Sequence, residues 1–250
     1  MRRGYLLALL ASVLVGLLYG IAQPSWRYDL SNTAEVTFSL IPLLVAVLSL
    51  RRSRRDCRWF GSVDSFLLLG FLFWFLGEFT WSFYALVLRV AIPFPSLADV
   101  FWLAGYPFLL LGMVSFVSPF RTAITQGHLL RALIVSVVAV GLIVSSIVVP
   151  VFSLSTDLVG NAVSLAYPLL DIALLFAGLV GLLLFWGGKV ARGWYWLTAG
   201  AILNAVADMM FAYLTAAGAY YDGHPLELLY ALGYVCFALA VYESFGGMLQ

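Results

Sequence analysis

Residues 161–186 read NAVSLAYPLLDIALLFAGLVGLLLFW, an apolar stretch in which Asp171 is the one charged side chain. About 20 such residues in a helix cross the hydrocarbon core of a bilayer. Backbone N–H and C=O groups in lipid must be hydrogen-bonded within the protein, which leaves an α-helix or a β-barrel. This stretch is longer than a barrel strand and does not alternate strictly between polar and apolar residues, so an α-helix is expected. This stretch therefore predicts a transmembrane helix.

Similar apolar stretches occur along the whole chain. The eight predicted spans are residues 5–22, 34–50, 60–88, 97–118, 129–150, 161–186, 193–217 and 225–246. Hydrophobic residues make up 64% of the 250 residues and charged residues 10%, with a mean hydropathy of +1.03. A soluble domain with so few charged residues would lack the polar surface that keeps it in solution. The predicted fold class is an all-α, multi-pass integral protein of the cell membrane.

The basic residues predict the orientation of this bundle. With eight spans, both termini lie on one side of the membrane. The basic residues on that side are Arg2, Arg3, Arg51, Arg52, Arg54, Arg55, Arg58, Arg121, Arg131, Lys189 and Arg192. Arg27 and Arg89 lie on the other side. The positive-inside rule therefore places both termini in the cytoplasm. The basic run at 51–58 is interpreted as a topology anchor, and no nucleic-acid partner is expected.

The two halves of the chain resemble each other at an offset of about 130 residues. The matched pairs are Pro42 with Pro168, Gly70 with Gly200, Glu78 with Asp208, Asp99 with Glu227, Trp102 with Tyr230, Gly105 with Gly233, and Tyr106 with Tyr234. Four spans in each half give both halves the same orientation, the parallel class of repeat. We expect one domain over residues 1–250, with repeat one at 1–118, a linker at 119–128 and repeat two at 129–250.

Acidic side chains within the spans are the residues with the strongest potential for chemistry. Carboxylates are costly in lipid, so they mark functional sites unless they are paired or cap a helix. Asp99 and Glu227 fall at predicted helix N-termini, where capping explains them. Glu78, Asp171 and Asp208 lie deeper, and either hydrogen bonding between helices or a ligand site explains those three.

A ligand site would also use the aromatic and amide side chains that share helix faces with these acids. The predicted ligand-binding residues, which we expect to line a pocket in the outer half of the bilayer, are Glu78, Asp171, Asp208, Asn204, Trp81, Trp102, Tyr106 and Tyr234. No catalytic residue is assigned. No metal-ligand spacing occurs in the sequence, so no metal is expected.

The histidines and cysteines offer little further chemistry. His128 and His224 fall on opposite sides of the predicted membrane, so they cannot together hold one haem, although a haem with a single histidine ligand stays open. Cys57 and Cys236 are predicted at different depths, which argues against a disulfide between them. The cofactor therefore stays undetermined.

Several motifs carry a family resemblance. Residues 77–81 (GEFTW), 93–107 (PFPSLADVFWLAGYP) and 167–171 (YPLLD), with Ala207-Asp208 and Gly233-Tyr234, resemble the multi-span membrane sensor region that precedes GGDEF-type diguanylate cyclases and some sensor kinases. The resemblance covers about residues 60–246 and implies a membrane input module. No output domain follows in this sequence, so the resemblance implies a separate signalling partner or a module that binds a ligand on its own. The pairs Gly77-Glu78 and Ala207-Asp208 are also similar to the eight-span lysoplasmalogenase family.

Three classes of function follow from these features. The first is a sensor-like membrane protein that binds a small amphipathic ligand or cofactor, either alone, as a homo-oligomer or with a signalling partner. The second is an intramembrane lipid hydrolase that uses Glu78 and Asp208 as paired carboxylates. The third is a small-solute transporter or haem-binding electron carrier. The sequence has no histidine or nucleophile beside the carboxylates, which favours binding over catalysis.

Overall fold

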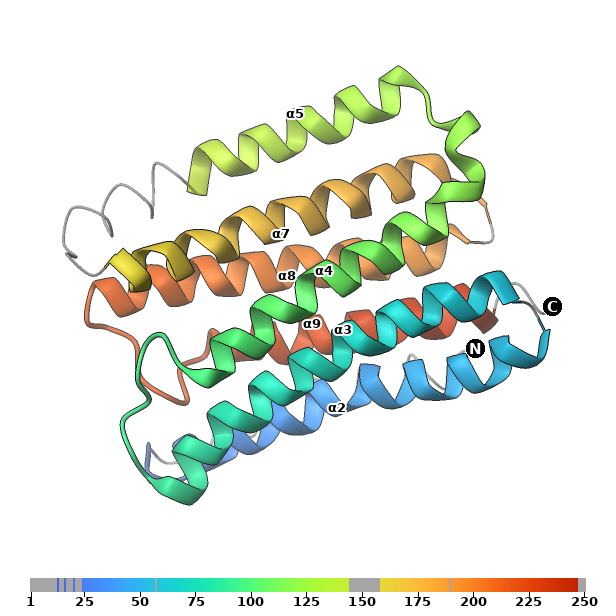
Figure 1. The fold of residues 1–250 in the computed structure, drawn as a ribbon. Coiled ribbons are helices and arrows are strands. Elements are labelled where there is room, and N and C mark those ends of the chain that lie inside the picture. Colours follow the sequence, from blue (N-terminus) through green and yellow to red (C-terminus); the bar gives the residue numbers. More distant parts are fainter. Residues whose placement is uncertain are drawn as a thin grey trace.

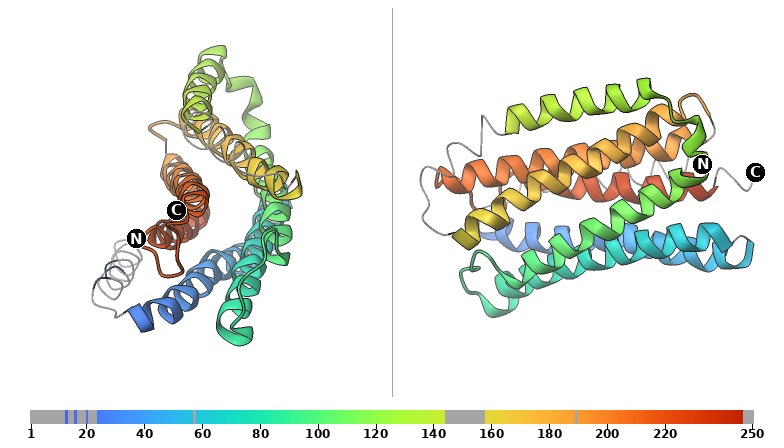
Figure 2. Two further views of the ribbon diagram at one scale, coloured as in Figure 1. Left: turned by 90° about the vertical axis from the view of Figure 1, so that its left-hand side faces the viewer. Right: turned by 45° about the horizontal axis from the view of Figure 1, so that its top comes forward.

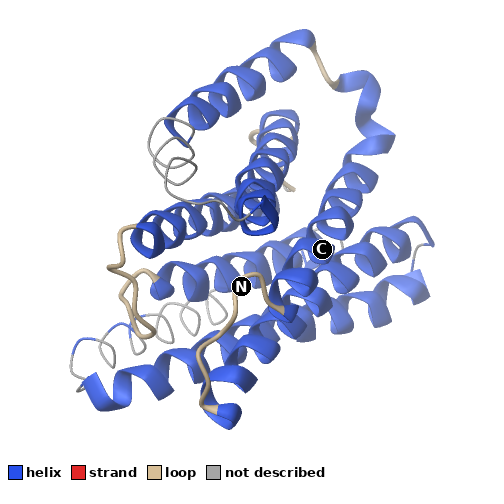
Figure 3. Cartoon of the chain, turned by 60° about the vertical axis from the view of Figure 1, so that its left-hand side comes forward, coloured by secondary structure: helices blue, strands red, loops and turns tan. Residues whose placement is uncertain are grey.

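The computed structural model describes residues 13, 16, 20, 24–56, 58–143, 158–188 and 190–246, and this part of the chain is helical and contains no strands (Figure 3). The main helices are α2 (Pro24–Asp56), α3 (Arg58–Ser82), α4 (Leu97–Val117), α5 (Gln126–Ile143), α7 (Leu158–Leu184), α8 (Ala191–Ala216) and α9 (Glu227–Gly246) (Figure 1). Two short helices join them, a π-helix η1 (Phe83–Leu88) after α3 and a 3₁₀-helix η2 (Ser118–Ala123) after α4.

Six helices of the described chain are long and apolar enough to cross a bilayer. They correspond to the predicted spans at 34–50, 60–88, 97–118, 161–186, 193–217 and 225–246. The predicted span at 5–22 falls outside the described residues except at 13, 16 and 20, and the span at 129–150 is described as far as Ile143. These helices indicate a multi-pass membrane protein.

The helices form a bundle in which α8 and α9 lie inside an arc made by α2, α3, α4 and α7 (Figure 2). Helix α2 packs against α3 and α9, α3 packs against α4, and α4 packs against α7. Helix α7 also packs against α8 and α5, and α5 lies at the periphery of the bundle (Figure 1). Helix α5 buries Ala132 and Ser136 and leaves a row of leucines and valines exposed, as a helix facing lipid does.

Small residues set the distance between α3 and α4. A Cβ on Gly105 would lie 3.1 Å from the backbone oxygen of Gly70 and would overlap the Trp74 indole. A Cβ on Gly70 would in turn overlap the side chain of Leu109. Glycines at membrane-helix crossings allow such close approach of the backbones.

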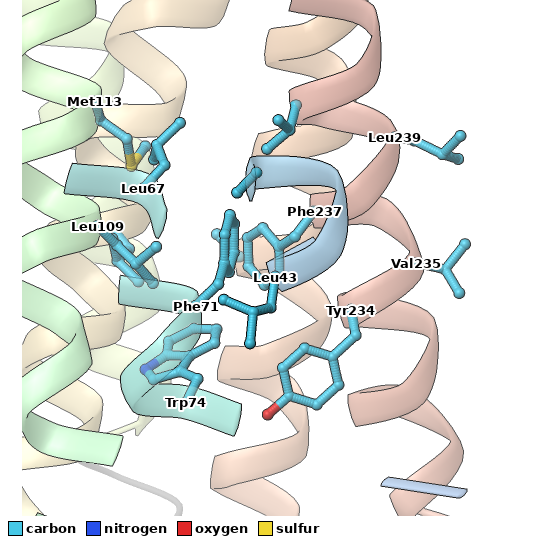
Figure 4. Packing of buried hydrophobic residues seen from close by; sticks show 14 of the residues in the cluster. Leu43, Leu67, Phe71, Trp74, Leu109, Met113, Tyr234, Val235, Phe237 and Leu239 are labelled. Carbon is cyan, nitrogen blue, oxygen red and sulfur yellow. The ribbon is translucent and has the colours of Figure 1, made fainter. Parts of the chain in front are cut away.

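The apolar core lies between α2, α3, α4 and α9. Leu67, Phe71 and Trp74 of α3 face Phe237 and Tyr234 of α9, and the Phe71 and Phe237 ring centroids are 5.8 Å apart (Figure 4). Trp74 packs edge-on against Tyr234, with 6.2 Å between the ring centroids. Tyr234 belongs to this core but carries a polar hydroxyl, so the core borders a polar region at that point.

The connection between α3 and α4 runs along this polar region. The π-helix η1 ends at Arg89, which adopts a left-handed conformation with φ 52°. Residues 89–96 are extended or bent, and α4 begins at Leu97 with Ser96 as its N-cap. The turn at Arg89 therefore redirects the chain across the end of the bundle.

The predicted linker at 119–128 is partly helical. Helix η2 covers its first residues, and α5 begins at Gln126, where Thr125 Oγ1 accepts the backbone N–H of His128 at 3.2 Å. Pro119 suits the first turn of η2, and Thr125 caps the start of α5. The division of the chain into two repeats joined by residues 119–128 stays a prediction.

Candidate functional site

A cavity of about 750 Å³ lies between α2, α3, α4, α7, α8 and α9. Its lining includes residues of the connection 89–96 and of the connection before α9. Its charged lining residues are Glu35, Glu78, Asp99, Asp208, Asp222 and Arg89. Its aromatic lining residues are Trp74, Trp81, Trp102, Phe94, Phe211, Tyr28, Tyr106, Tyr167, Tyr220, Tyr230 and Tyr234. A cavity of this size is in the range of small-molecule sites.

Asp208 of α8 is held by side chains from three helices. Tyr230 of α9 donates its hydroxyl to Asp208 Oδ1 at 2.6 Å. Asn204, one turn earlier on α8, donates Nδ2 to Asp208 Oδ2 at 3.2 Å. The hydroxyl of Tyr106 on α4 lies 3.2 Å from the same oxygen. The carboxyl group is therefore fixed in position at the cavity wall.

Tyr106 joins Asp208 to Asp171 of α7. Its hydroxyl lies 2.7 Å from Asp171 Oδ1, and Tyr106 is 1% exposed. A tyrosine hydroxyl has one proton, so it donates to one of the two carboxyl groups. The second contact is favourable when the other carboxyl is protonated and donates to the tyrosine oxygen. Two buried carboxyl groups this close do not both ionise cheaply, which agrees with a proton shared by the pair.

Glu78 of α3 has the corresponding arrangement with α9. Tyr234 donates its hydroxyl to Glu78 Oε1 at 2.5 Å, and the Trp102 side chain of α4 also donates to Glu78. The backbone oxygen of Trp102 accepts the Trp74 indole N–H at 3.1 Å, and this hydrogen bond holds Trp102 in position. Glu78 is 5% exposed and interacts electrostatically with Asp208. The two deep carboxyl groups thus face one cavity, each with a tyrosine partner.

Asp99 caps α4 and also contributes to the cavity wall. Asp99 Oδ2 accepts the Ser96 backbone N–H at 2.7 Å, and Ser96 Oγ accepts the Ala98 N–H at 3.2 Å, which is a capping box. The predicted capping role of Asp99 is confirmed. Asp99 Oδ1 also accepts the Tyr167 hydroxyl from α7 at 2.8 Å, so this cap ties α4 to α7.

Glu227 holds the connection that precedes α9. Its Oε1 accepts the Gly223 backbone N–H at 2.8 Å and the Tyr220 hydroxyl at 3.0 Å. Gly223 has φ +88°, a conformation that side chains disfavour. Asp222 lies in the same connection. Burial raises the pKa of its carboxyl group, and the side chains of Tyr220 and Trp81 partly offset this shift by hydrogen bonding. Burial likewise raises the pKa of the Tyr220 hydroxyl, with Glu227 as the next cause.

The structure brings seven of the eight predicted ligand-binding residues to the cavity wall. They are Glu78, Trp81, Trp102, Tyr106, Asn204, Asp208 and Tyr234. Asp171 does not line the cavity and reaches it through the Tyr106 hydroxyl. A role of these residues in binding a ligand stays a prediction.

Sequence reasoning missed several lining residues, above all Glu35 of α2. Glu35 is 8% exposed and lines the cavity. The sequence shows an acidic residue at the edge of the predicted span 34–50. Because the edge of a span usually lies in water, Glu35 was not expected to be buried. Helix α2 begins at Pro24, ten residues earlier than the predicted span, so Glu35 lies well inside the helix. Tyr230 and Tyr167 were also missed, although Tyr230 is the repeat match of Trp102 and Tyr167 begins the motif at 167–171.

The histidines are engaged at helix ends. His128 Nδ1 lies 3.4 Å from the Thr125 N–H, and His224 Nδ1 accepts the Leu226 N–H at 3.1 Å. Neither histidine lines the cavity. Cys236 is a buried free thiol, and Cys57 falls outside the described residues. Within the described ranges, no group of three or more metal-ligating side chains is placed to hold a metal ion.

Comparison with protein-family models, with curated proteins and with solved structures gives no match to this chain.

Proposed function

We propose that this protein is a multi-pass membrane protein that binds a small amphipathic ligand in the acidic and aromatic cavity. The observation that carries the proposal is the cavity itself, a space of about 750 Å³ in an apolar helical bundle with the carboxyl groups of Glu78 and Asp208 in its wall. The aromatic side chains suit the apolar part of such a ligand and the carboxyl groups suit its polar part.

The hydrogen bonds of the two carboxyl groups favour binding over hydrolysis. Glu78 accepts the hydroxyl of Tyr234, and Asp208 accepts the hydroxyl of Tyr230. These hydrogen bonds fix the carboxyl groups at the cavity wall, and neither histidine lies there as a further base. This arrangement suits the positioning of a ligand. Signalling to a separate partner is a further step that such a binding protein would serve.

Conservative amide variants test this proposal. Glu78→Gln and Asp208→Asn keep the shape of the side chains, and the amide oxygen of each can still accept the hydroxyl of Tyr234 or Tyr230. Asp208→Asn replaces the oxygen that accepts from Asn204 by an NH2 group, so its melting temperature in detergent should fall by several degrees, whereas that of Glu78→Gln should change by only a few. The fraction of protein that retains a co-purified small molecule, measured by native mass spectrometry, should fall about tenfold in each, as for the loss of a buried charged hydrogen bond.

Glu243→Gln is the matched control for these variants. Glu243 is 3% exposed on α9, pairs with Arg192 at 3.4 Å and does not line the cavity. It should keep wild-type occupancy. Wild-type occupancy in both cavity variants would contradict the proposed function and leave the carboxyl groups as ties between helices.

We also propose that the chain has eight spans in two parallel repeats with both termini in the cytoplasm. Helix contacts and hydrogen bonds support the repeat. Helix α2 packs against α9 in the way that its matched helix α7 packs against α4. The Glu78–Tyr234 hydrogen bond has its matched partner in Asp208–Tyr106, as an approximate twofold axis requires.

Reporter fusions test the orientation. A fluorescent-protein fusion after residue 57 or 190 should fluoresce, because both positions lie on the cytoplasmic side, and alkaline phosphatase at either position should be inactive. Fusions after residue 91 or 220 should show the reverse. Phosphatase activity at 57 or 190 would overturn the proposed orientation.

A further inference from the structure

The cavity has an excess of acidic side chains. Five carboxyl groups line it, and Arg89 is the one basic side chain among the described lining residues. Arg89 Nη1 is bonded at 2.7 Å to Asp29 Oδ1, with both side chains about half exposed. The charge of Arg89 is therefore paired with Asp29, which is not one of the five lining acids. This balance of charge favours a cationic occupant over an anionic or neutral one.

Glu35 differs from the other four acids of the cavity. Glu78, Asp99, Asp208 and Asp222 each lie within hydrogen-bonding distance of a tyrosine hydroxyl. The Glu35 carboxyl lines the cavity and is 8% exposed, yet it accepts no hydrogen bond from the described residues.

The charged groups that act on Glu35 are also acidic. They are Glu227, Glu78 and Asp222. A buried carboxylate without a donor or counter-charge is costly. Its position at the cavity wall makes a bound cation the group that would offset this cost.

The arrangement of the acids argues against a metal ion as that cation. Calcium takes six to eight oxygen ligands, and magnesium requires close octahedral geometry. Within the described ranges, no three acidic, histidine or cysteine side chains converge closely enough for a metal site. The carboxyl groups instead surround a volume that admits an organic molecule.

Aromatic rings form a wall of the same cavity. Trp81 lies 5.7 Å from Trp102 and 6.2 Å from Phe211 between ring centroids. Tyr220 packs edge-on against Phe211 at 4.6 Å. Faces of tryptophan and tyrosine rings attract organic cations, and substituted ammonium groups are bound in proteins by such rings together with a carboxylate.

We propose that the ligand of this cavity is a substituted ammonium ion with an apolar body, and that Glu35 is its counter-ion. This inference rests on the proposed function, because it names the chemical class of the ligand of the same site. The ammonium group can belong to a free amine or to a lipid headgroup, and the test separates these two sources.

Three isosteric probes test the charge preference of the full-length protein in dodecyl maltoside micelles, which contain no ammonium group. The probes are benzyltrimethylammonium, its neutral isostere neopentylbenzene and the anion phenylmethanesulfonate. Isothermal titration should show that the cation binds about tenfold or more tightly than either of the others. Equal binding of the neutral isostere would overturn the cation inference and leave the proposed function standing. Absence of binding by all three probes would overturn both.

The Glu35→Gln variant tests the counter-ion. It should weaken benzyltrimethylammonium about tenfold or more and leave neopentylbenzene unchanged, because only the charge is removed. Without ligand its melting temperature should equal or exceed that of the wild type, since a buried unpaired carboxylate has been neutralised. Glu243→Gln should bind both probes as the wild type does. Unchanged affinity of Glu35→Gln for the cation would overturn the assignment of Glu35.

The source of the ammonium group is separated by repeating the titration in phosphatidylcholine nanodiscs. An unchanged affinity for benzyltrimethylammonium supports a free amine, whereas a large loss of affinity supports competition by the lipid headgroup. The nanodisc titration is informative only if the protein in micelles binds the cation more tightly than the neutral and anionic probes.

Discussion

Gly105→Ala is expected to lower the free energy of unfolding by about 1–3 kcal/mol, the usual cost of an added methyl group in a packed interior. The new Cβ would overlap the Trp74 indole and lie 3.1 Å from the backbone oxygen of Gly70. Trp74 cannot easily move away, because its N–H is bonded to the Trp102 oxygen and its ring packs against Tyr106, Tyr234 and Phe237. The loss should appear as a decrease of the melting temperature in detergent.

Two other glycines of the chain are matched controls for this substitution. A Cβ on Gly233 would lie 3.6 Å from the Gly200 oxygen, an ordinary contact, and a Cβ on Gly141 of α5 would have nothing within 4 Å. Alanine at these positions should be neutral or should stabilise the helix by up to about 1 kcal/mol. Equal melting temperatures for Gly105→Ala and Gly233→Ala would contradict the close crossing of α3 and α4.

Tyr106→Phe is expected to lower the free energy of unfolding by about 1–3 kcal/mol, the range for buried polar groups that lose a partner. The phenylalanine ring keeps the packing against Trp74, but the hydroxyl that joins Asp171 and Asp208 is lost. Asp171 is 2% exposed, and its Oδ2 has no hydrogen-bond partner among the described residues. The variant therefore leaves a deeply buried carboxyl group without its closest donor. Thermal unfolding in detergent measures the effect.

Tyr213→Phe is the control, because Tyr213 lies on the same bundle with 53% of its surface exposed and no hydroxyl contact to a cavity residue. It should leave the melting temperature unchanged. A double-mutant cycle of Tyr106→Phe with Asp171→Ala should show a coupling between the two residues, because either substitution alone removes the hydrogen bond between them. Independent effects in that cycle would mean that the bond between α4 and α7 contributes nothing to stability.

The helices themselves were predictable from local sequence. Residues 161–186 predicted α7, and the observed helix is Leu158–Leu184. The apolar length of a helix and the capping role of Asp99 depend on residues that are close in sequence, so the sequence predicts them without knowledge of the tertiary structure. The same reasoning predicted a span at 34–50 but missed the first ten residues of α2, because this part of the helix is polar in sequence although Ser31 and Asn32 are buried in the bundle.

The tertiary structure decided which polar groups meet. Sequence spacing placed Asn204 and Asp208 on one helix face, and they are hydrogen-bonded. Ser82 lies one turn after Glu78 on α3, yet its Oγ donates to the Asn32 backbone oxygen of α2 at 2.9 Å, a contact that spacing along one helix does not predict. Sequence spacing gave no reason to connect Glu35 with Glu78, which lie 43 positions apart in the sequence and act on one another across α2 and α3.

The physical reason is that apolar length is a property of one segment, whereas the partner of a polar side chain depends on how helices rotate and cross. Those rotations follow from packing of shapes such as Gly105 against Trp74, and no single segment contains that information. The sequence by itself therefore determined a bundle of membrane-length helices with buried acids. Only the tertiary structure decided that Glu35 shares the cavity of Glu78 and Asp208, and that Asp171 reaches this cavity through Tyr106.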